Sequence, residues 1–139
     1  MTNVVQWNSI PVEEWPTLQP YVDTALLPVV RMSETDWAET LSRCARLAKC
    51  ADRVEQHLAG RLVRFPILTL YGSASPDEAV AALKPTFAHV VVLTDGEPFA
   101  VPGGVVLSTH EREGDPVAAL VEEIVALWND PEQQKSDNA

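Results

Sequence analysis

Tyr21 to Val30, YVDTALLPVV, is the stretch of this sequence that decides the fold. After the polar pair Asp23-Thr24 it is almost continuously apolar, which is typical of a strand that is covered on both faces, as the strands of parallel sheets are. We therefore predict that it forms the central strand of an α/β domain. Pro28 has no N–H to give to a neighbouring strand, so it should lie near the carboxyl end of the strand or face an unpaired edge.

The rest of the chain alternates between helical and strand patterns. Further strands are expected over Arg64 to Tyr71, His89 to Thr94 and Val105 to Ser108, and helices over Glu34 to Ala59, Ser75 to about Lys84 and Asp115 to Trp128. Ser33 and Asp36 have the spacing of a capping box. Ser75 and Asp115 each precede a proline, and a cap residue followed by proline favours a helix start.

This order, β-α-β-α-β-β-α, predicts an α/β fold with one domain over residues 1–130 and a polar, disordered tail over residues 131–139. We expect a three-layer sandwich in which helices cover both faces of a mainly parallel, four-stranded sheet, Rossmann-like but without a dinucleotide fingerprint. About ten residues separate the last two strands, which is barely enough for a parallel crossover. The orientation of the fourth strand, about 105–108, therefore stays open.

Composition and charge restrict the function. The 139 residues carry a formal charge of -10, which disfavours binding to nucleic acid or to anionic lipid. No apolar run reaches the roughly 18 residues of a membrane helix, and the first ten residues lack the pattern of a secretory signal. We expect a soluble cytoplasmic protein in which Cys44 and Cys50 are free packing thiols.

The long predicted helix has two faces. An apolar stripe should pack on the sheet; it consists of Trp37, Leu41, Cys44, Leu47, Ala48, Ala51, Val54 and Leu58. Four cations, Arg43, Arg46, Lys49 and Arg53, share a different face. They form either a solvated face, with Arg43 paired to Glu39, or a docking face for an acidic protein partner or a second copy of the chain.

Ligands of open α/β sheets bind beyond the carboxyl ends of the strands. Six polar side chains follow or end the predicted strands there and are our ligand-binding candidates: Arg31, Ser73, Ser75, Asp95, Thr109 and His110. Asp23, at the opposite end of the first strand, is expected to bridge nearby polar groups instead. The turn before Pro76 also offers backbone N–H groups to an anion.

Several chemistries lack their motifs. There is no GxGxxG and no GxxxxGK[ST], so dinucleotide and P-loop nucleotide binding are disfavoured. The three histidines show no local spacing for a metal site, and we expect neither metal nor cofactor. Ser73, Asp95 and His110 follow the chain order of a hydrolase triad, but GSASP lacks the second glycine of a nucleophile elbow. We assign no catalytic residues, and enzymatic activity stays open.

Several segments of the chain together resemble a known family. They are Trp7 followed by YVDTALLP, then VEQHLAGRLVRFPILTLYG, a VVVLT strand and GGVVLST. The sequence is similar, from about Trp7 to Trp128, to the YpiF-like family of small uncharacterised proteins from Bacillus and its relatives, and YVDTALLP and GRLVRFP are the most specific parts. The resemblance implies a cytoplasmic bacterial protein of unassigned function and supplies no site residues.

Two functions follow from these observations. The first is a non-catalytic interaction or accessory protein that uses the basic helix face. The second is a domain that binds a small ligand or a phosphate ester, either a binding domain or a degenerate enzyme, with its site at the carboxyl ends of the strands.

Overall fold

In the computed structural model of the chain, the described residues are 10, 12–32, 36–110, 112 and 114–129. The strand β1, Thr24–Arg31, lies at the centre of the sheet, as predicted. It pairs on one side with β4, His89–Thr94, and on the other with β2, Leu62–Arg64, and β3, Leu68–Leu70. The last strand, β5, Val105–Ser108, pairs with β4, and every one of these pairings is parallel. The orientation left open for the fourth strand is therefore settled as parallel.

Pro28 explains why one predicted strand is divided in two. The expected strand from Arg64 to Tyr71 is wrong, because β2 and β3 are separate and pair with the two halves of β1. The carbonyl of Leu26 accepts from Phe65 and the N–H of Met32 donates to Leu70, so alternate residues of β1 face this side. Pro28 then faces the gap between β2 and β3, where its missing N–H leaves no partner unsatisfied. It lies in the middle of β1 rather than near its end.

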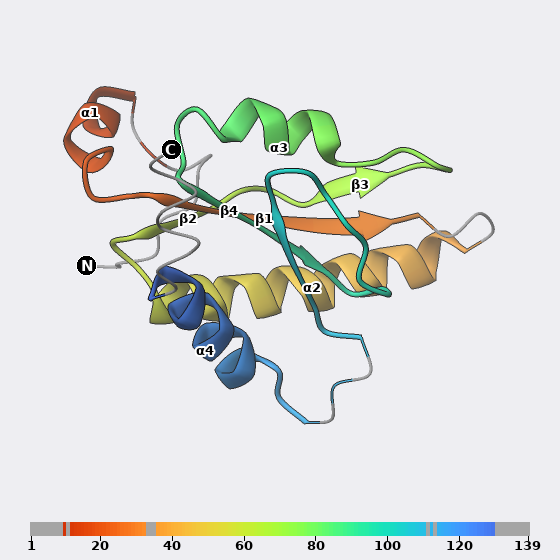
Figure 1. Cartoon of the computed structure of the whole chain (residues 1–139). Coiled ribbons are helices and arrows are strands. Elements are labelled where there is room, and N and C mark those ends of the chain that lie inside the picture. Colours follow the sequence, from red (N-terminus) through yellow and green to blue (C-terminus); the bar gives the residue numbers. More distant parts are fainter. Residues whose placement is uncertain (1–9, 11, 33–35, 111, 113, 130–139) are drawn as a thin grey trace.

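Helices cover both faces of the sheet, which makes a three-layer α/β sandwich (Figure 1). The helices α2, Trp37–His57, and α4, Val117–Trp128, pack on one face, and their buried side chains meet Leu26, Val91 and Leu93. On the other face lie α3, Asp77–Leu83, and the short α1, Trp15–Leu18, which follows a 3-10 turn over Val12–Glu14. Trp15 holds α1 in place through its ring contact with Phe87, with 6.1 Å between the ring centroids.

The start of α2 differs from the prediction. Asp36 is its N-cap and accepts a hydrogen bond from the N–H of Glu39, so the helix begins three residues later than expected. Ser33, the predicted cap, lies outside the described residues. The apolar stripe packs on the sheet from Cys44 onward, but Trp37 and Leu41 are 68% and 66% exposed. Their inclusion in the packed face was wrong, because in these first turns of α2 the buried side chain is that of Thr40.

The helix starts predicted from cap-then-proline pairs are one residue off, because Pro76 and Pro116 are the N-cap residues of α3 and α4, but the side chains of Ser75 and Asp115 do bond to the helix starts. Ser75 Oγ accepts from the N–H of Asp77 at 3.3 Å, and Asp115 Oδ1 accepts from the N–H of Val117 at 3.0 Å. Each side chain thus satisfies a backbone donor at a helix start. The predicted tail over residues 131–139 lies outside the described residues. Within the part of the chain that the structure covers, no helix is both long and apolar enough to span a bilayer.

Asp23 has the structural role predicted for it at the amino ends of the strands. Its carboxylate forms a bidentate ion pair with Arg61 at 2.9 and 3.0 Å and accepts from the hydroxyl of Thr24. The indole N–H of the buried Trp128 donates to Thr24 Oγ1 at 2.7 Å, and Arg61 stacks on the Trp128 ring. This network fixes the last turn of α4 to the sheet, so its first turn is set at the opposite, carboxyl edge.

A candidate anion-binding groove

A groove of about 460 Å³ lies between α2, the carboxyl ends of β4 and β5, and the start of α4. Its size falls within the usual range for small-ligand sites. Five cations line it, Arg43, Arg46, Lys49, Arg53 and Arg112, together with the carboxylates of Asp95 and Asp115. The four-residue basic face of α2 and two of the predicted strand-end residues, Asp95 and Thr109, therefore belong to one site. The sequence had predicted them as two separate sites.

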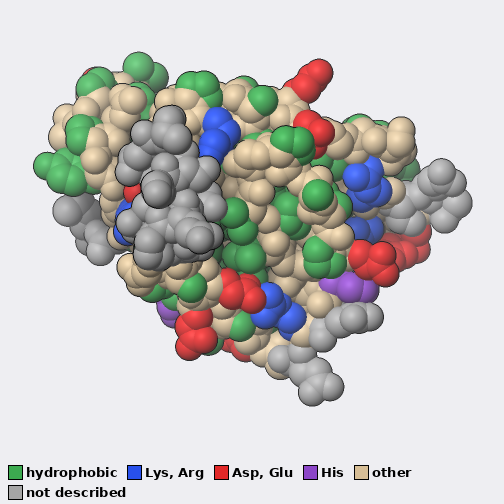
Figure 2. Space-filling view, viewed as in Figure 1, with side chains coloured by type: hydrophobic (Ala, Val, Ile, Leu, Met, Phe, Trp, Pro, Cys, Tyr) green, Lys and Arg blue, Asp and Glu red, His purple; other side chains and the backbone are tan. Residues whose placement is uncertain are grey.

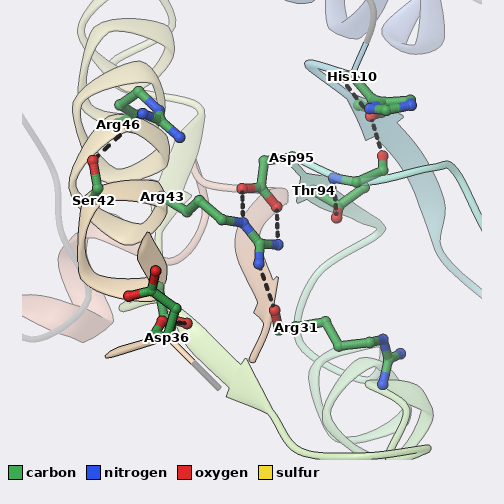
Figure 3. A network of polar contacts seen from close by, with 11 residues as sticks. Arg31, Asp36, Ser42, Arg43, Arg46, Thr94, Asp95 and His110 are labelled. Carbon is green, nitrogen blue, oxygen red and sulfur yellow. Dashed lines mark hydrogen bonds and ion pairs between the residues drawn. The ribbon is translucent and has the colours of Figure 1, made fainter. Parts of the chain in front are cut away.

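Arg43 connects α2 to the strand ends. Its Nε and Nη2 atoms donate to the two carboxylate oxygens of Asp95 at 2.9 and 3.0 Å, and Nη1 donates to the carbonyl of Arg31 at 2.9 Å (Figure 3). The hydrogen bond with Asp95 raises the pKa of Arg43 above its ordinary value, although burial acts against it. The pair is mostly buried, with side chains only 19% and 17% exposed. The expected ion pair of Arg43 with Glu39 is therefore wrong, because the acidic partner of Arg43 is Asp95. Arg43 thus contributes to the stability of the fold as well as to the positive charge of the groove.

Two other cations of the groove have acidic partners. Arg53 pairs with Asp115 at 2.6 Å, across the space between α2 and α4. The hydrogen bond from the N–H of Val117, and then the contact with Arg53, lower the pKa of Asp115, so this carboxylate is ionised at neutral pH. Arg112 donates to Glu123 at 2.8 and 2.9 Å and to the carbonyl of Ser108. These pairs fix the walls of the groove and neutralise part of its charge.

Arg46 and Lys49 have no such partner. Among the described residues, no carboxylate lies within ion-pair distance of either, and both are exposed. Arg46 makes only a long hydrogen bond of 3.4 Å to Ser42, one turn back along α2. Arg46, Lys49 and Arg53 follow one another along α2 at intervals of three and four residues. At this spacing, like charges on a helix repel each other. Among the described residues, the positive charge of Arg46 and Lys49 in the groove is therefore not paired, in a protein whose formal charge is -10.

This concentration of cations contrasts with another face of the molecule. Figure 2 shows the view of Figure 1 in space-filling form, and there the Lys and Arg side chains are scattered, several of them close to Asp or Glu side chains. The cations of the groove come from α2 and the segment between β5 and α4, which meet only in the folded chain. Folding thus gathers positive charge at the carboxyl edge.

The groove offers little for covalent chemistry at neutral pH. Cys50 lines it, but burial, and next the charge of Asp115, raise the pKa of its thiol, so the reactive thiolate is disfavoured. Both carboxylate oxygens of Asp95 are bonded to Arg43, which leaves Asp95 poorly suited to serve as a general base. Cys44 and Cys50 are both free thiols, as predicted, although Cys50 also borders the groove. The chemistry that fits is electrostatic binding.

A second hollow, which we call the switch-point hollow, lies on the other side of the Arg43–Asp95 pair. It has a volume of about 550 Å³ and lies between the carboxyl ends of β1 and β4. The chain leaves β1 through α2 and returns as β2 and β3 on one flank of β1. It then passes through α3 and returns as β4 on the other flank. This divergence marks the place where open α/β sheets bind ligands. Its lining is mixed: the apolar residues are Val29, Met32, Leu70, Pro98 and Phe99, and the polar ones are Arg31, Arg43, Thr94, Asp95 and Glu97.

The six strand-end candidates have different positions. Asp95 lines both cavities, Thr109 lines the groove and Arg31 lines the switch-point hollow. The Arg31 guanidinium donates to the carbonyls of Gly72 and Ala74, and its side chain points away from Asp95 (Figure 3). It therefore holds the turn before α3. Ser73, Ser75 and His110 line neither cavity.

Sequence reasoning missed several contributors to these cavities, among them Arg112, residues 114–117 and Phe99. Arg112 follows the end of β5 by four residues, so extending the strand-end rule slightly along the chain would have found it. Phe99 lies in the connection after β4, where no regular pattern marks it.

Among the residues that the structure describes, no group of three or more histidine, cysteine or acidic residues is placed to hold a metal ion. No protein-family model matches this sequence, and neither a curated protein nor a solved structure matches it. The resemblance to the YpiF-like family stays a prediction. The fold and site define the class: a single-domain parallel α/β protein with a basic groove at the carboxyl edge of its sheet.

Proposed function

We propose that this protein binds a small multivalent anion, such as a phosphate ester, in the groove beside α2. The observation that carries the proposal is a pair of cations, Arg46 and Lys49, that have no acidic partner among the described residues and that line a cavity of ligand size. A row of like charges on one helix costs about 0.2–0.5 kcal/mol for each neighbouring pair. A bound anion would remove that repulsion and would add charge-assisted hydrogen bonds.

The position of the groove also supports a small ligand. It lies at the carboxyl edge of the sheet, the edge at which α/β domains bind ligands. The ion pairs of Arg43 and Arg53 hold its walls, so the binding geometry exists before the ligand arrives. A preformed site needs less ordering on binding and so binds more tightly.

Thermal unfolding with a panel of anions at constant ionic strength tests the proposal. A ligand at about 100 times its Kd should add about 2.7 kcal/mol to the free energy of unfolding, whereas chloride at equal ionic strength should not. Lys49→Gln should weaken the effect, and Lys84→Gln, an equal loss of charge at the end of α3, should leave it intact. Equal responses of the two variants would show that only the net charge of the protein matters.

A second candidate function is the docking of an acidic protein partner or a second copy of the chain. One observation favours it: α2 exposes Trp37 and Leu41, two large apolar side chains, one turn apart. The double variant Arg46→Glu/Lys49→Glu should then abolish association without unfolding the protein, because neither side chain has an acidic partner to lose in the part of the chain that the structure describes. Sedimentation velocity at low and high salt would measure it, since screening weakens contacts between exposed charges. Unaltered sedimentation and partner capture would contradict docking.

A further inference from the structure

The groove and the switch-point hollow are neighbours that share two wall residues, Arg43 and Asp95. We propose that the ligand is a bipartite organic anion, with its charged group in the groove and an apolar ring in the switch-point hollow. This inference rests on the proposed function and specifies its ligand class.

The two cavities have different chemistry. The groove is lined by five cations, two of which have no acidic partner among the described residues, whereas the hollow combines five apolar residues with two arginines, Thr94 and the carboxylates of Asp95 and Glu97. An inorganic anion would fill only the groove. A ring in the hollow would cover the half-buried side chains of Met32 and Phe99, and removing apolar surface from water favours binding by about 25 cal/mol for each Å².

The Arg43–Asp95 pair sets the shape of the ligand. Its hydrogen bonds use both oxygens of Asp95 and the Nε, Nη1 and Nη2 atoms of Arg43, so the pair is a fixed partition between the cavities. Arg46 lies one helical turn from Arg43, which is about 4.5 Å along the axis at 1.5 Å per residue. A ligand that contacts Arg46 and also fills the hollow must extend over the Arg43–Asp95 pair. Its ring and its anionic group should therefore be joined by a flexible linker.

A series of phenylalkyl phosphates tests this shape. Calorimetry would compare inorganic phosphate with phenyl phosphate and its phenylethyl and phenylbutyl homologues. We expect a tethered homologue to bind about ten- to a hundredfold more tightly than inorganic phosphate, which corresponds to burying one ring. Phenylbutanol, which lacks the anion, should bind far more weakly than the phosphate.

Substitutions in the switch-point hollow test whether the ring of the ligand binds there. Phe99→Ala and Met32→Ser should each reduce the gain from the ring while leaving the affinity for inorganic phosphate unchanged. Tyr21→Ala removes an exposed aromatic side chain at the amino end of β1 and should alter nothing. Melting curves would confirm that both hollow variants fold, and either variant alone suffices for the comparison.

The outcomes separate the two proposals. If inorganic phosphate binds through Lys49 but no homologue binds more tightly, or if the gain survives both hollow variants, the bipartite ligand is refuted and the anion groove stands. If neither inorganic phosphate nor any homologue binds the wild-type protein, the proposed function fails as well.

Discussion

Glu55 provides a sharp test of how burial controls charge in this fold. It lies on α2, is completely buried, and neither carboxylate oxygen has a hydrogen-bond partner among the described residues. Burial, and next the charge of Asp52, raise its pKa from 4.5 to about 7, against the opposing effect of Arg64. The folded protein therefore holds this proton over a pH range in which the unfolded chain has lost it.

The sign of the effect follows from proton linkage. Between pH 4.5 and about 7 the folded state binds more protons than the unfolded state, so the free energy of unfolding falls as pH rises. The shift from 4.5 to about 7 corresponds to a loss of about 3 kcal/mol, complete above the folded pKa. Glu55→Gln cannot ionise, so it should gain about that much relative to the wild type as pH rises through this window.

Denaturant unfolding of both proteins from about pH 4.5 to about pH 8 measures this difference. The value at low pH includes the cost of a buried amide, so the change with pH is the diagnostic quantity. Glu122→Gln, at an exposed position within α4, is the matched control and should show no comparable trend. A difference between Glu55→Gln and wild type that stays constant across the range would refute the reasoning.

Three further predictions concern the contacts that hold the site. Arg43→Met should destabilise the protein by about 2–3 kcal/mol because it leaves the mostly buried Asp95 without its partner, and adding Asp95→Leu should recover part of that loss in a double-mutant cycle; purely additive losses would contradict this. Asp115→Ala should lower the free energy of unfolding by about 1 kcal/mol, because the hydrogen bond to the N–H of Val117 at the start of α4 is lost. Asp115→Asn can still accept that hydrogen bond, so it should keep most of the wild-type stability in denaturant unfolding. Equal losses in the two variants would mean that the charge of Asp115 matters rather than the hydrogen bond. Trp128→Phe removes the hydrogen bond to Thr24 and should lower the free energy of unfolding by about 1–2 kcal/mol, and an unchanged melting curve would show that the bond contributes nothing.

The sequence was sufficient to predict the central strand and the positions of β4 and β5. These follow from apolar runs and from caps such as Asp115, which are local signals. The divided strand was also visible in principle, because Pro28 in β1 and Pro66 in RFPILTLY both interrupt pairing. That consequence depends on which strands are neighbours, and the two prolines are 38 residues apart in the chain.

The site itself was predicted only in fragments. The sequence indicated the basic face of α2 and the strand-end residues, but not that Arg43 reaches Asp95 or that Arg112 completes the groove. Those contacts depend on how α2 is rotated and placed over the sheet, which helical periodicity does not specify. For the same reason Trp37 was assigned to the packed stripe, although its side chain is exposed and the buried residue of that turn is Thr40.

Amide chemical-shift mapping with pyrophosphate tests the central claim most directly. Titration at constant ionic strength should give saturable shifts at Arg46, Lys49 and Arg53 and at the start of α4, and Lys49→Gln should weaken the fitted affinity. Residues around Asp23, at the opposite edge of the sheet, should not respond. If the groove amides show no saturable shift, or if saturable shifts appear at another place in the fold, the groove is not an anion-binding site.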